Sequence, residues 1–338
     1  IKASISWIYY FYTSISLTYT RMTLQQLEYA LALRQHESYS RAAKAVGISQ
    51  PAMSIQIRKL EEEMDLTLFD RSQKKVKPTY QGKIFLERAQ LLITQAKQLR
   101  SLAIELSDEL SGTLNLGIIP TLAPYLLPLF IDKLNEAYPK LTLNVIEALT
   151  EDVIQGIKVG DLDGGIISTP IESRTTFTTI PLFYEGFKLF VAPDHPLSKV
   201  EMVDVTQIPV NDIWLLKEGN CFRDQVDNIC ELSRAEADHD LFYFESNSIE
   251  ALCRIVEFKG GVTFLPELTT IFLDRDREDL VKDLKGPRKV REISLLYLPN
   301  IARQPALDQV GQAIQNNIPK KWLEKGQSEA IPTKVRVE

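Results

Sequence analysis

The sequence predicts an α/β protein with a winged helix-turn-helix head, one long linker helix and a C-terminal part made of two α/β lobes. Three observations carry this prediction. Two short helices with apolar faces flank a tight turn at Gly47. A proline-free apolar stripe of about 30 residues follows them. From residue 113 onward, segments with strand character alternate with segments of helical periodicity, as in a parallel or mixed sheet.

Composition places the chain among soluble globular proteins of two or three domains. Its 338 residues are 44% hydrophobic and 25% charged, which is ordinary for that class. Three cysteines in this length exclude a disulfide scaffold and favour a reducing compartment, the cytoplasm. The three histidines are isolated, and no cysteine spacing is typical of zinc. We therefore expect no metal site and no cofactor.

The net charge of −6 is unevenly distributed along the chain. Residues 22–100 hold 13 Lys and Arg against 8 Asp and Glu, whereas residues 101–338 carry a net charge of −13. A basic head on an acidic body indicates an anionic partner at the head, and nucleic acid is the usual one. An unevenly charged, solvated surface is the alternative.

Residues 1–21 differ in composition from everything that follows. They lack the basic start and cleavage site of a signal peptide, and they hold too many Ser and Thr residues for a membrane span. Met22 comes directly after them. We interpret residues 1–21 as a non-native or disordered extension and expect no membrane partner; a membrane anchor is the alternative.

Residues 22–80 form the predicted head. Ser49 can cap the second helix of the pair, with Pro51 in its first turn. The second helix of such a pair enters the major groove of DNA with its N-terminal residues nearest the base edges. Its candidate contacts to bases or phosphates are Ser49, Gln50, Pro51, Ser54, Gln56, Arg58 and Lys59.

A basic turn between two short strands follows and reads as a wing. Arg71, Lys74 and Lys75 in this wing are expected to lie along phosphates. Taken separately, a helix pair is often part of a bundle, and a lysine run is usually a solvated loop. Their occurrence in sequence favours a DNA-binding head.

Residues 81–112 are predicted to form the linker helix and a hinge. Thr79 can cap this helix, and Ser111-Gly112 ends it. A helix of about 30 residues is roughly 45 Å long, which is too long for one small domain to bury. A partner helix, and hence a homodimer, is the simple explanation; packing within the same chain is the alternative.

The remaining sequence divides into two predicted lobes and a tail. Lobe I comprises residues 113–183 and 287–318, and lobe II comprises residues 184–286. Residues 319–338 are the C-terminal tail. Ligands of open α/β sheets bind in the crevice at the carboxyl ends of the strands.

Two of the three cysteines, Cys221 and Cys230, lie nine positions apart in lobe II. Arg223 follows the first closely, and a nearby cation favours the reactive thiolate. Nine residues of a continuous helix rise roughly 13–14 Å, whereas a disulfide needs Cα atoms within about 7 Å. In a helical segment the two thiols can pair only after local refolding. Two inert thiols are the alternative, and Cys253 is interpreted as a small buried hydrophobe.

Four motifs in the head carry a family resemblance. They are Ser40-Arg41-Ala42-Ala43-Lys44, Ile48-Ser49-Gln50-Pro51-Ala52-Met53-Ser54, Ile57-Arg58-Lys59-Leu60-Glu61 and Leu68-Phe69-Asp70-Arg71. With the layout that follows, they resemble the LysR-type transcriptional regulators over residues 22–318. The resemblance implies a winged helix-turn-helix, a dimerising linker helix and a two-lobed effector domain of the periplasmic-binding-protein type. Ile55 departs from it, because many relatives carry Arg there.

Further motifs resemble those of the peroxide-sensing members of that family. They are Ile119-Pro120-Thr121, Glu147-Ala148-Leu149-Thr150 and Cys221-Phe222-Arg223-Asp224-Gln225 with Cys230. This resemblance implies that Cys221 reacts with peroxide and that Cys230 then joins it in a disulfide. The residues implied to support the peroxide site are Thr121, Thr150, Asn220, Arg223, Asp224 and Arg291.

Alternatives remain open for several of these supporting residues. Thr121 and Thr150 can be interpreted instead as caps of the helices that follow them, and Asp224 as the partner of a nearby Arg. Asn220 is a departure, since enteric relatives carry His before the reactive cysteine. An Asn there can hydrogen-bond but cannot titrate, so we expect the thiolate to depend more on Arg223 and on neighbouring backbone donors.

The sequence as a whole favours a cytoplasmic transcription activator that senses hydrogen peroxide and is not an enzyme. The implied partners are double-stranded promoter DNA, hydrogen peroxide, further copies of the chain in a dimer or tetramer, and RNA polymerase. One alternative is a LysR-type regulator gated by a reversibly bound small molecule. Another is a thiol peroxidase, and a third is a solute-binding protein; the basic winged head argues against both.

Overall fold

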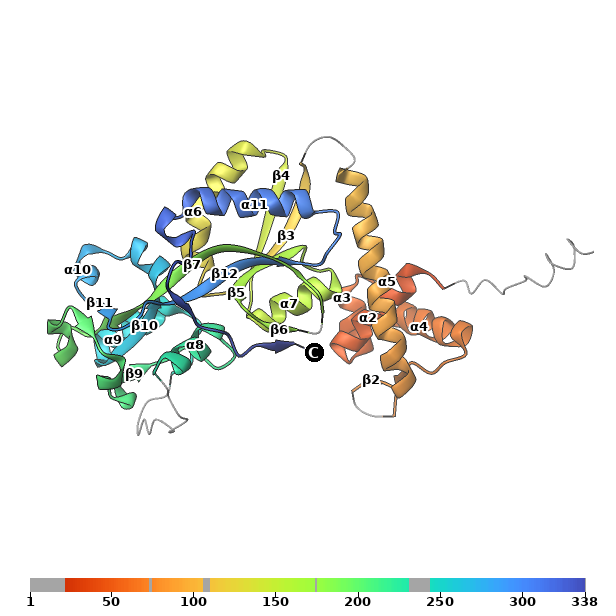
Figure 1. Cartoon of the computed structure of the whole chain (residues 1–338). Coiled ribbons are helices and arrows are strands. Elements are labelled where there is room, and N and C mark those ends of the chain that lie inside the picture. The colour runs from red at the N-terminus through yellow and green to blue at the C-terminus, as the bar shows by residue number, and fades with distance from the viewer. Residues whose placement is uncertain (1–21, 73–74, 106–109, 174, 231–243, 338) are drawn as a thin grey trace, which may run out of the picture. The chain divides into compact units, whose positions relative to one another are not determined.

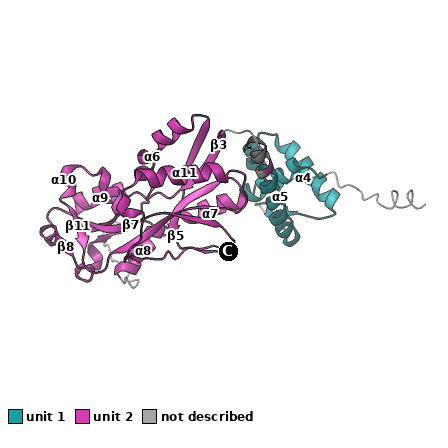
Figure 2. Ribbon diagram, turned by 45° about the horizontal axis from the view of Figure 1, so that its top comes forward, with its two compact units in different colours: residues 1–97 teal, residues 98–338 magenta. Residues whose placement is uncertain are grey.

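The structure, a computed structural model, describes residues 22–72, 75–105, 110–173, 175–230 and 244–337. Contacts within the chain divide it into two compact units, residues 1–97 and residues 98–338 (Figure 2). The extension expected at residues 1–21 and the wing residue Lys74 lie outside the described residues. Within the described part, no helix is long and apolar enough to cross a bilayer.

Three short helices pack around one core in the first unit (Figure 1). They are α2 (Leu24–His36), α3 (Tyr39–Ala45) and α4 (Gln50–Met64). Ser49 caps α4 by accepting a hydrogen bond of 3.3 Å from the Ala52 amide. Gly47, with φ +73°, makes the turn between α3 and α4, where a side chain would be strained. The predicted helix-turn-helix is confirmed, with its core formed by Leu27, Leu33, Ala42, Met53, Ile57 and Leu60.

A two-stranded wing follows α4, as predicted. Strands β1 (Phe69–Asp70) and β2 (Lys77–Pro78) pair antiparallel. Glu61 of α4 ties the wing down, because its carboxylate accepts hydrogen bonds from the Leu68 amide at 2.7 Å and the Phe69 amide at 3.1 Å. These hydrogen bonds therefore hold the wing against α4.

The linker helix α5 (Tyr80–Glu105) begins where the sequence predicted. Thr79 caps it, accepting a hydrogen bond of 2.9 Å from the Gly82 amide. Gly82 packs so closely that a Cβ there would lie 2.0 Å from the Leu68 carbonyl oxygen, so no larger residue fits without a backbone shift. Several large apolar side chains of α5 remain exposed on this chain: Ile84, Leu91, Leu92 and Leu99.

The second unit is built on one mixed sheet whose central strands run in the order β4-β3-β5-β12-β7-β10-β9. In chain order the strands are β3 (Gly112–Ile118), β4 (Leu141–Glu147), β5 (Gly164–Thr169), β6 (Glu172–Ser173), β7 (Thr178–Val191), β8 (Met202–Val203), β9 (Ile213–Trp214), β10 (Val262–Pro266), β11 (Val281–Leu284) and β12 (Lys289–Tyr297). The helices are α6 (Ala123–Ala137), α7 (Thr150–Val159), α8 (Cys221–Cys230), α9 (Ile249–Lys259), α10 (Arg275–Glu278) and α11 (Gln304–Asn317). Strand β3 pairs parallel with β4 and β5, and β12 pairs antiparallel with β5 and β7.

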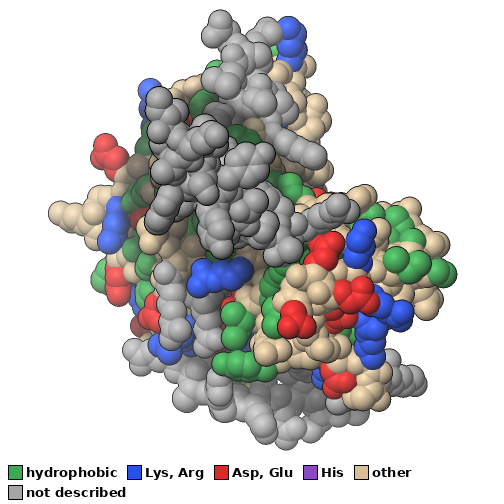
Figure 3. Space-filling model, turned by 90° about the vertical axis from the view of Figure 1, so that its right-hand side faces the viewer, with side chains coloured by type: hydrophobic (Ala, Val, Ile, Leu, Met, Phe, Trp, Pro, Cys, Tyr) green, Lys and Arg blue, Asp and Glu red, His purple; other side chains and the backbone are tan. Residues whose placement is uncertain are grey.

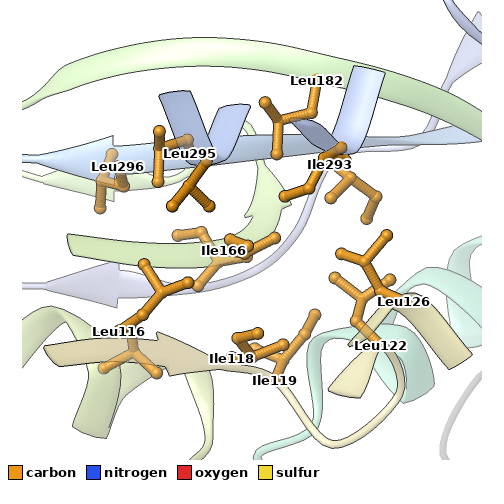
Figure 4. Packing of buried hydrophobic residues seen from close by; sticks show 14 of the residues in the cluster. Leu116, Ile118, Ile119, Leu122, Leu126, Ile166, Leu182, Ile293, Leu295 and Leu296 are labelled. Carbon is orange, nitrogen blue, oxygen red and sulfur yellow. The ribbon is translucent and has the colours of Figure 1, made fainter. Parts of the chain in front are cut away.

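Two hydrophobic cores give the second unit its two lobes. The first packs β3 and β5 against α6, β7 and β12, with Leu126, Ile166 and Ile293 among its residues (Figure 4). The second core holds the later part of β7, together with β10, α8 and α9. Strand β7 contributes Phe183 to the first core and Phe190 to the second, so it carries the chain across between the lobes. This confirms the predicted two-lobed α/β architecture.

The C-terminal tail packs on the second unit. Trp322 is buried and stacks on Phe183, with ring centroids 6.3 Å apart. Strand β13 (Glu329–Ala330) pairs with the start of β12, and β14 (Arg336–Val337) pairs with β6. In Figure 1 this dark-blue segment passes from β12 to β6 beside α8.

Candidate thiol site and nucleic-acid interface

The two cysteines stand at opposite ends of helix α8 (Cys221–Cys230). Asn220 holds the start of this helix, because its Oδ1 accepts a hydrogen bond of 3.0 Å from the Phe222 amide. All three cysteines are free thiols. Nine residues of α-helix separate Cys221 from Cys230 by about 13–14 Å of rise, so a disulfide between them requires α8 to unwind.

Cys221 lies in a buried, positively charged environment. Its exposed fraction is 2%, and that of Arg291 on β12 is 0%. The Arg291 guanidinium is held by an ion pair with Glu185 at 2.8 Å and donates a hydrogen bond of 2.9 Å to the Thr121 hydroxyl. It also lies 5.1 Å from the centre of the Phe222 ring. These contacts hold the Arg291 guanidinium in place inside the protein.

Burial and charge act in opposite directions on the Cys221 thiol. Burial raises the pKa of Cys221, and this is the largest effect. The Arg291 charge, the Thr150 hydroxyl and the Phe222 amide lower the pKa, and the Asp224 charge raises it again. At rest Cys221 is therefore protonated near neutral pH, beside groups that would stabilise its thiolate.

Three buried polar atoms on α7 and around the first turn of α8 have no hydrogen-bond partner in the described part of the chain. They are Thr150 Oγ1, Asn220 Nδ2 and Gln225 Oε1. The Thr150 hydroxyl is close enough to the thiol to lower its pKa, but it is not aligned for a full hydrogen bond. Unpaired buried polar groups are costly and uncommon in folded proteins. These atoms are therefore candidates to bind a small molecule that carries hydrogen-bonding oxygens.

Neither threonine caps the helix that follows it. The residue before the first turn of α6 is Leu122, and that before α7 is Leu149, and in neither case is there a side-chain capping bond. The hydroxyl of Thr121 instead accepts from Arg291, and that of Thr150 faces the thiol site. The capping interpretation is therefore wrong for both residues.

The structure corrects the expectation for Arg223. Its guanidinium donates a hydrogen bond of 3.0 Å to the Leu216 carbonyl and lies 3.8 Å from Glu218. Residues two apart on a helix point in different directions, so Arg223 turns away from Cys221. The positive charge near the thiol is that of Arg291, which is far away in sequence. Asp224 is half-buried, and burial raises its pKa while the charges of Lys334 and Arg223 oppose the shift.

The other two cysteines differ from Cys221. Cys230 is half-buried, and burial together with the Asp227 charge raises its pKa to about 12. Cys253 is 0% exposed and belongs to the lobe II core, which confirms it as a small buried hydrophobe. Among the described residues, no group of three or more His, Cys, Asp or Glu side chains could hold a metal ion.

The recognition helix α4 presents most of its predicted DNA contacts to solvent. Gln50, Pro51, Arg58 and Lys59 are exposed, and Ser54 is half-exposed. The exposed oxygen of Ser49 is already used in the cap of α4. Gln56 is half-buried and accepts a hydrogen bond of 3.3 Å from Gln26.

Two of the predicted wing contacts are tied within the head. Arg71 pairs with Glu61 at 2.6 Å and lies 5.8 Å from the Tyr39 ring centre, and Lys75 pairs with Glu37 at 2.8 Å. On the face seen in Figure 3, Lys and Arg side chains lie beside acidic and hydrophobic ones, so its described part is not uniformly basic.

Ile55, where the sequence departs from the family motif, is an exposed residue of α4. Its side chain is 64% exposed, which is unusual for a large apolar side chain. It lies between Pro51 and Arg58 on the solvent face of the helix. Its spacing from those residues, four and three positions, places it on the same face as both.

The head and the two-lobed unit together define a bacterial transcription regulator. The chain belongs to the LysR family, since the bacterial regulatory helix-turn-helix profile of that family matches residues 24–83 and the LysR substrate binding domain profile matches residues 107–318.

Within this family the chain is similar to proteins named for hydrogen peroxide. It is 34% identical over 298 residues to the hydrogen peroxide-inducible genes activator of Pectobacterium carotovorum, covering 88% of this chain and 97% of that protein. It is 34% identical over 295 residues to the DNA-binding transcriptional dual regulator OxyR of Escherichia coli K12, covering 87% and 95%.

Two solved structures of OxyR proteins are also similar to this chain. A full-length OxyR cysteine variant from Pseudomonas aeruginosa matches with a TM-score of 0.68 at 29% identity, covering 88% of this chain and 99% of that one. A cysteine variant of Corynebacterium glutamicum OxyR with bound hydrogen peroxide matches with a TM-score of 0.55 at 25% identity, covering 88% and 92%.

Proposed function

We propose that this LysR-type regulator senses hydrogen peroxide by oxidation of Cys221 and disulfide formation with Cys230, and that this switches promoter binding and activates oxidative-stress genes. The observation that carries the proposal is a buried thiol acted on by the buried Arg291 and by the Thr150 hydroxyl, which lacks a hydrogen-bond partner among the described residues. Similarity to activators named for hydrogen peroxide supports the choice of oxidant.

The chemistry balances in two steps. In the first, the Cys221 thiolate attacks one oxygen of hydrogen peroxide, the O–O bond breaks, and hydroxide leaves and takes up a proton to become water. Cys221 is then a sulfenic acid. In the second step the Cys230 sulfur attacks the Cys221 sulfur, the S–O bond breaks, and a second water leaves as the disulfide forms.

Each residue of the site has a role in the first step. Thr121, Thr150 and Asn220 would orient the peroxide through hydrogen bonds, and Arg291 would stabilise the negative charge on the thiolate and the leaving oxygen. Arg223 donates to the Leu216 carbonyl and Asp224 is half-buried, so their proposed role is to hold the first turn of α8 rather than to touch peroxide.

The signal would reach DNA through refolding of α8. Because the thiols are at opposite ends of one helix, the disulfide forces α8 to unwind, and lobe II must repack. We propose that the protein acts in the cytoplasm as a dimer or tetramer joined through α5, and that DNA binding by the head and contact with RNA polymerase give activation. One oxidation per protein is a signal, so no catalytic turnover is required.

Footprinting tests this function. The probe is a DNA duplex that the reduced protein has selected from a random-sequence pool. The protein is footprinted on this duplex before and after treatment with one equivalent of hydrogen peroxide. We expect the wild-type footprint to change, and Cys221→Ser and Cys230→Ser to keep the reduced footprint. A peroxide-dependent change that persists in Cys221→Ser would rule out the thiol mechanism.

The second candidate is a regulator gated by a reversibly bound small molecule, because the same buried polar atoms could bind such a ligand. Such a regulator would respond to its ligand in Cys221→Ser as strongly as in the wild type. A thiol peroxidase would instead consume many equivalents of peroxide per protein in the presence of dithiothreitol, so peroxide consumption measured beside the footprint separates all three.

A further inference from the structure

The tail beyond α11 forms a strap across helix α8. This strap, defined as residues 329–337, starts as β13 beside β12 and ends as β14 beside β6. Its first anchors are hydrogen bonds from the Glu329 amide to the Arg288 carbonyl at 3.0 Å and from the Ile331 amide to the Val290 carbonyl at 2.8 Å. Its last anchor is a hydrogen bond of 3.0 Å from the Glu172 amide to the Val335 carbonyl. The family profile ends at residue 318, so the strap lies outside the part of the chain that it matches.

Helix α8 turns one polar face toward the strap. Gln225 donates a hydrogen bond of 2.8 Å to the Ile331 carbonyl, and Asn228 donates one of 3.5 Å to the Pro332 carbonyl. These two side chains are three positions apart and so share one face of the helix. Gln225 is fully buried and also donates a hydrogen bond of 3.2 Å to Ser168 on β5. It therefore links the strap, helix α8 and lobe I.

The strap also closes the apolar side of the helix. Ile331 is 4% exposed and belongs to the same core as Phe222, Val226 and Ile229 of α8. Farther along, Val335 is buried in the lobe I core. The strap therefore spans both cores and lies over the residues between the two cysteines.

We propose that Gln225 and Ile331 are positioning residues, and that the strap holds α8 in its helical, reduced form. The unwinding that joins Cys221 to Cys230 must break the Gln225–Ile331 hydrogen bond and expose Ile331. The strap thereby sets how readily the disulfide forms. The redox part of this inference rests on the proposed function, whereas the clamp on α8 does not.

The clamp is tested first in the reduced protein without peroxide. Hydrogen exchange is measured on residues 222–230 in the wild type, in Ile331→Ala, and in a chain that ends at Gln327. The matched control is Ile318→Ala, which removes a side chain of similar burial from the lobe I core away from α8. We expect exchange in α8 to rise about tenfold or more in the two strap variants, with β3 unchanged as a check that lobe I is folded.

The redox consequence is tested by titrating the thiols against glutathione. We expect the equilibrium constant for the Cys221–Cys230 disulfide to rise in Ile331→Ala by the same factor as the α8 exchange, and Ile331→Val to return it toward the wild type. Wild-type exchange of α8 in the chain ending at Gln327 would overturn the clamp. If α8 exchange rises but no disulfide forms in any variant, the clamp stands and the proposed peroxide sensing fails.

Discussion

The Arg291 cation that acts on Cys221 belongs to an ion pair that lies wholly inside the protein. Glu185 and Arg291 are both 0% exposed, and Glu185 also accepts a hydrogen bond of 2.7 Å from the Leu268 amide. Burial raises the pKa of Glu185, and the Arg291 charge opposes this. Because Glu185 offsets part of the Arg291 charge, we expect it to restrain the reactivity of the Cys221 thiol.

The rate of Cys221 oxidation should therefore rise with pH. Burial raises the pKa of Cys221, so the reactive thiolate is the minor form below that pKa. We expect the rate constant with hydrogen peroxide to rise about tenfold per pH unit from about pH 6 to about pH 8. Stopped-flow fluorescence at several pH values would measure it, and a rate that is flat across this range would contradict the raised pKa.

Replacing Glu185 should make the thiol faster and the fold weaker. Glu185→Gln keeps the shape but leaves the Arg291 charge unopposed, which should lower the pKa of Cys221 and speed oxidation at neutral pH by up to about tenfold. The unpaired buried charge should cost about 3–5 kcal/mol of the free energy of unfolding.

The pH–rate profile and urea unfolding measure these two effects. Glu151→Gln, at an exposed carboxylate on α7, is the control and should change neither. An unshifted pH–rate profile in Glu185→Gln would show that Glu185 does not act on the thiol.

At this scale the sequence predicted some residues of the site and missed others. Cys221, Thr121, Thr150 and Arg291 were found because motif resemblance marks them directly. Glu185 was missed because it lies 106 positions from Arg291, and only the antiparallel pairing of β7 with β12 brings the two together. Arg223 was overrated because proximity in sequence does not place two side chains on one face of a helix.

At the scale of elements, the cations of α4 and of the wing differ. Some are exposed to solvent, and others are paired within the head. Arg58 and Lys59 project from α4 into solvent, whereas Arg71 is held by Glu61 and lies against Tyr39. Periodicity in the sequence predicted α4 well, because its apolar face is regular. It gave no information on which wing cations are already paired, since those partners come from other helices.

Two alanine variants should distinguish a cation that contacts DNA from one that stabilises the head. Arg58→Ala should weaken binding to DNA and reduce the slope of log K against log salt concentration by about one, with little change in thermal stability.

Arg71→Ala should lower the melting temperature of the head, because it leaves the buried side of Glu61 without its cation. Filter binding at several salt concentrations and calorimetry would measure both, and an unchanged salt slope in Arg58→Ala would remove that residue from the DNA interface.

At the scale of the whole molecule, α5 carries the surface that should join two chains. Leu91 is 51% exposed and Leu99 is 69% exposed. Ile84 and Leu91 are seven positions apart, as are Leu92 and Leu99, so each pair lies along one side of the helix two turns apart. Membership of the LysR family, whose regulators bind DNA as oligomers, fits this exposed stripe.

Disrupting this stripe should dissociate the oligomer. Leu91→Asp places a charge where an apolar contact between chains is proposed, so we expect sedimentation velocity to show a monomer and DNA affinity to fall at least about tenfold. Lys83→Asp, at an exposed polar position directly before Ile84 in α5, is the control. A Leu91→Asp protein with the wild-type sedimentation coefficient would exclude α5 as the interface.

The long-range order of the molecule was predictable only in part. Alternation of strands and helices predicted two α/β lobes, and the structure has them. The path of residues 329–337 over α8 was not predicted, because short strands that pair in parallel with distant partners leave no periodic pattern in the sequence.

The central claim is that hydrogen peroxide joins Cys221 to Cys230 at the expense of helix α8. The most direct measurement is peptide mapping by mass spectrometry after one equivalent of peroxide, with hydrogen exchange on residues 222–230 of the same sample. We predict a single Cys221–Cys230 disulfide and loss of exchange protection along α8, with Cys253 unmodified. A protein that keeps both thiols reduced, or forms the disulfide with α8 still protected, would contradict the account.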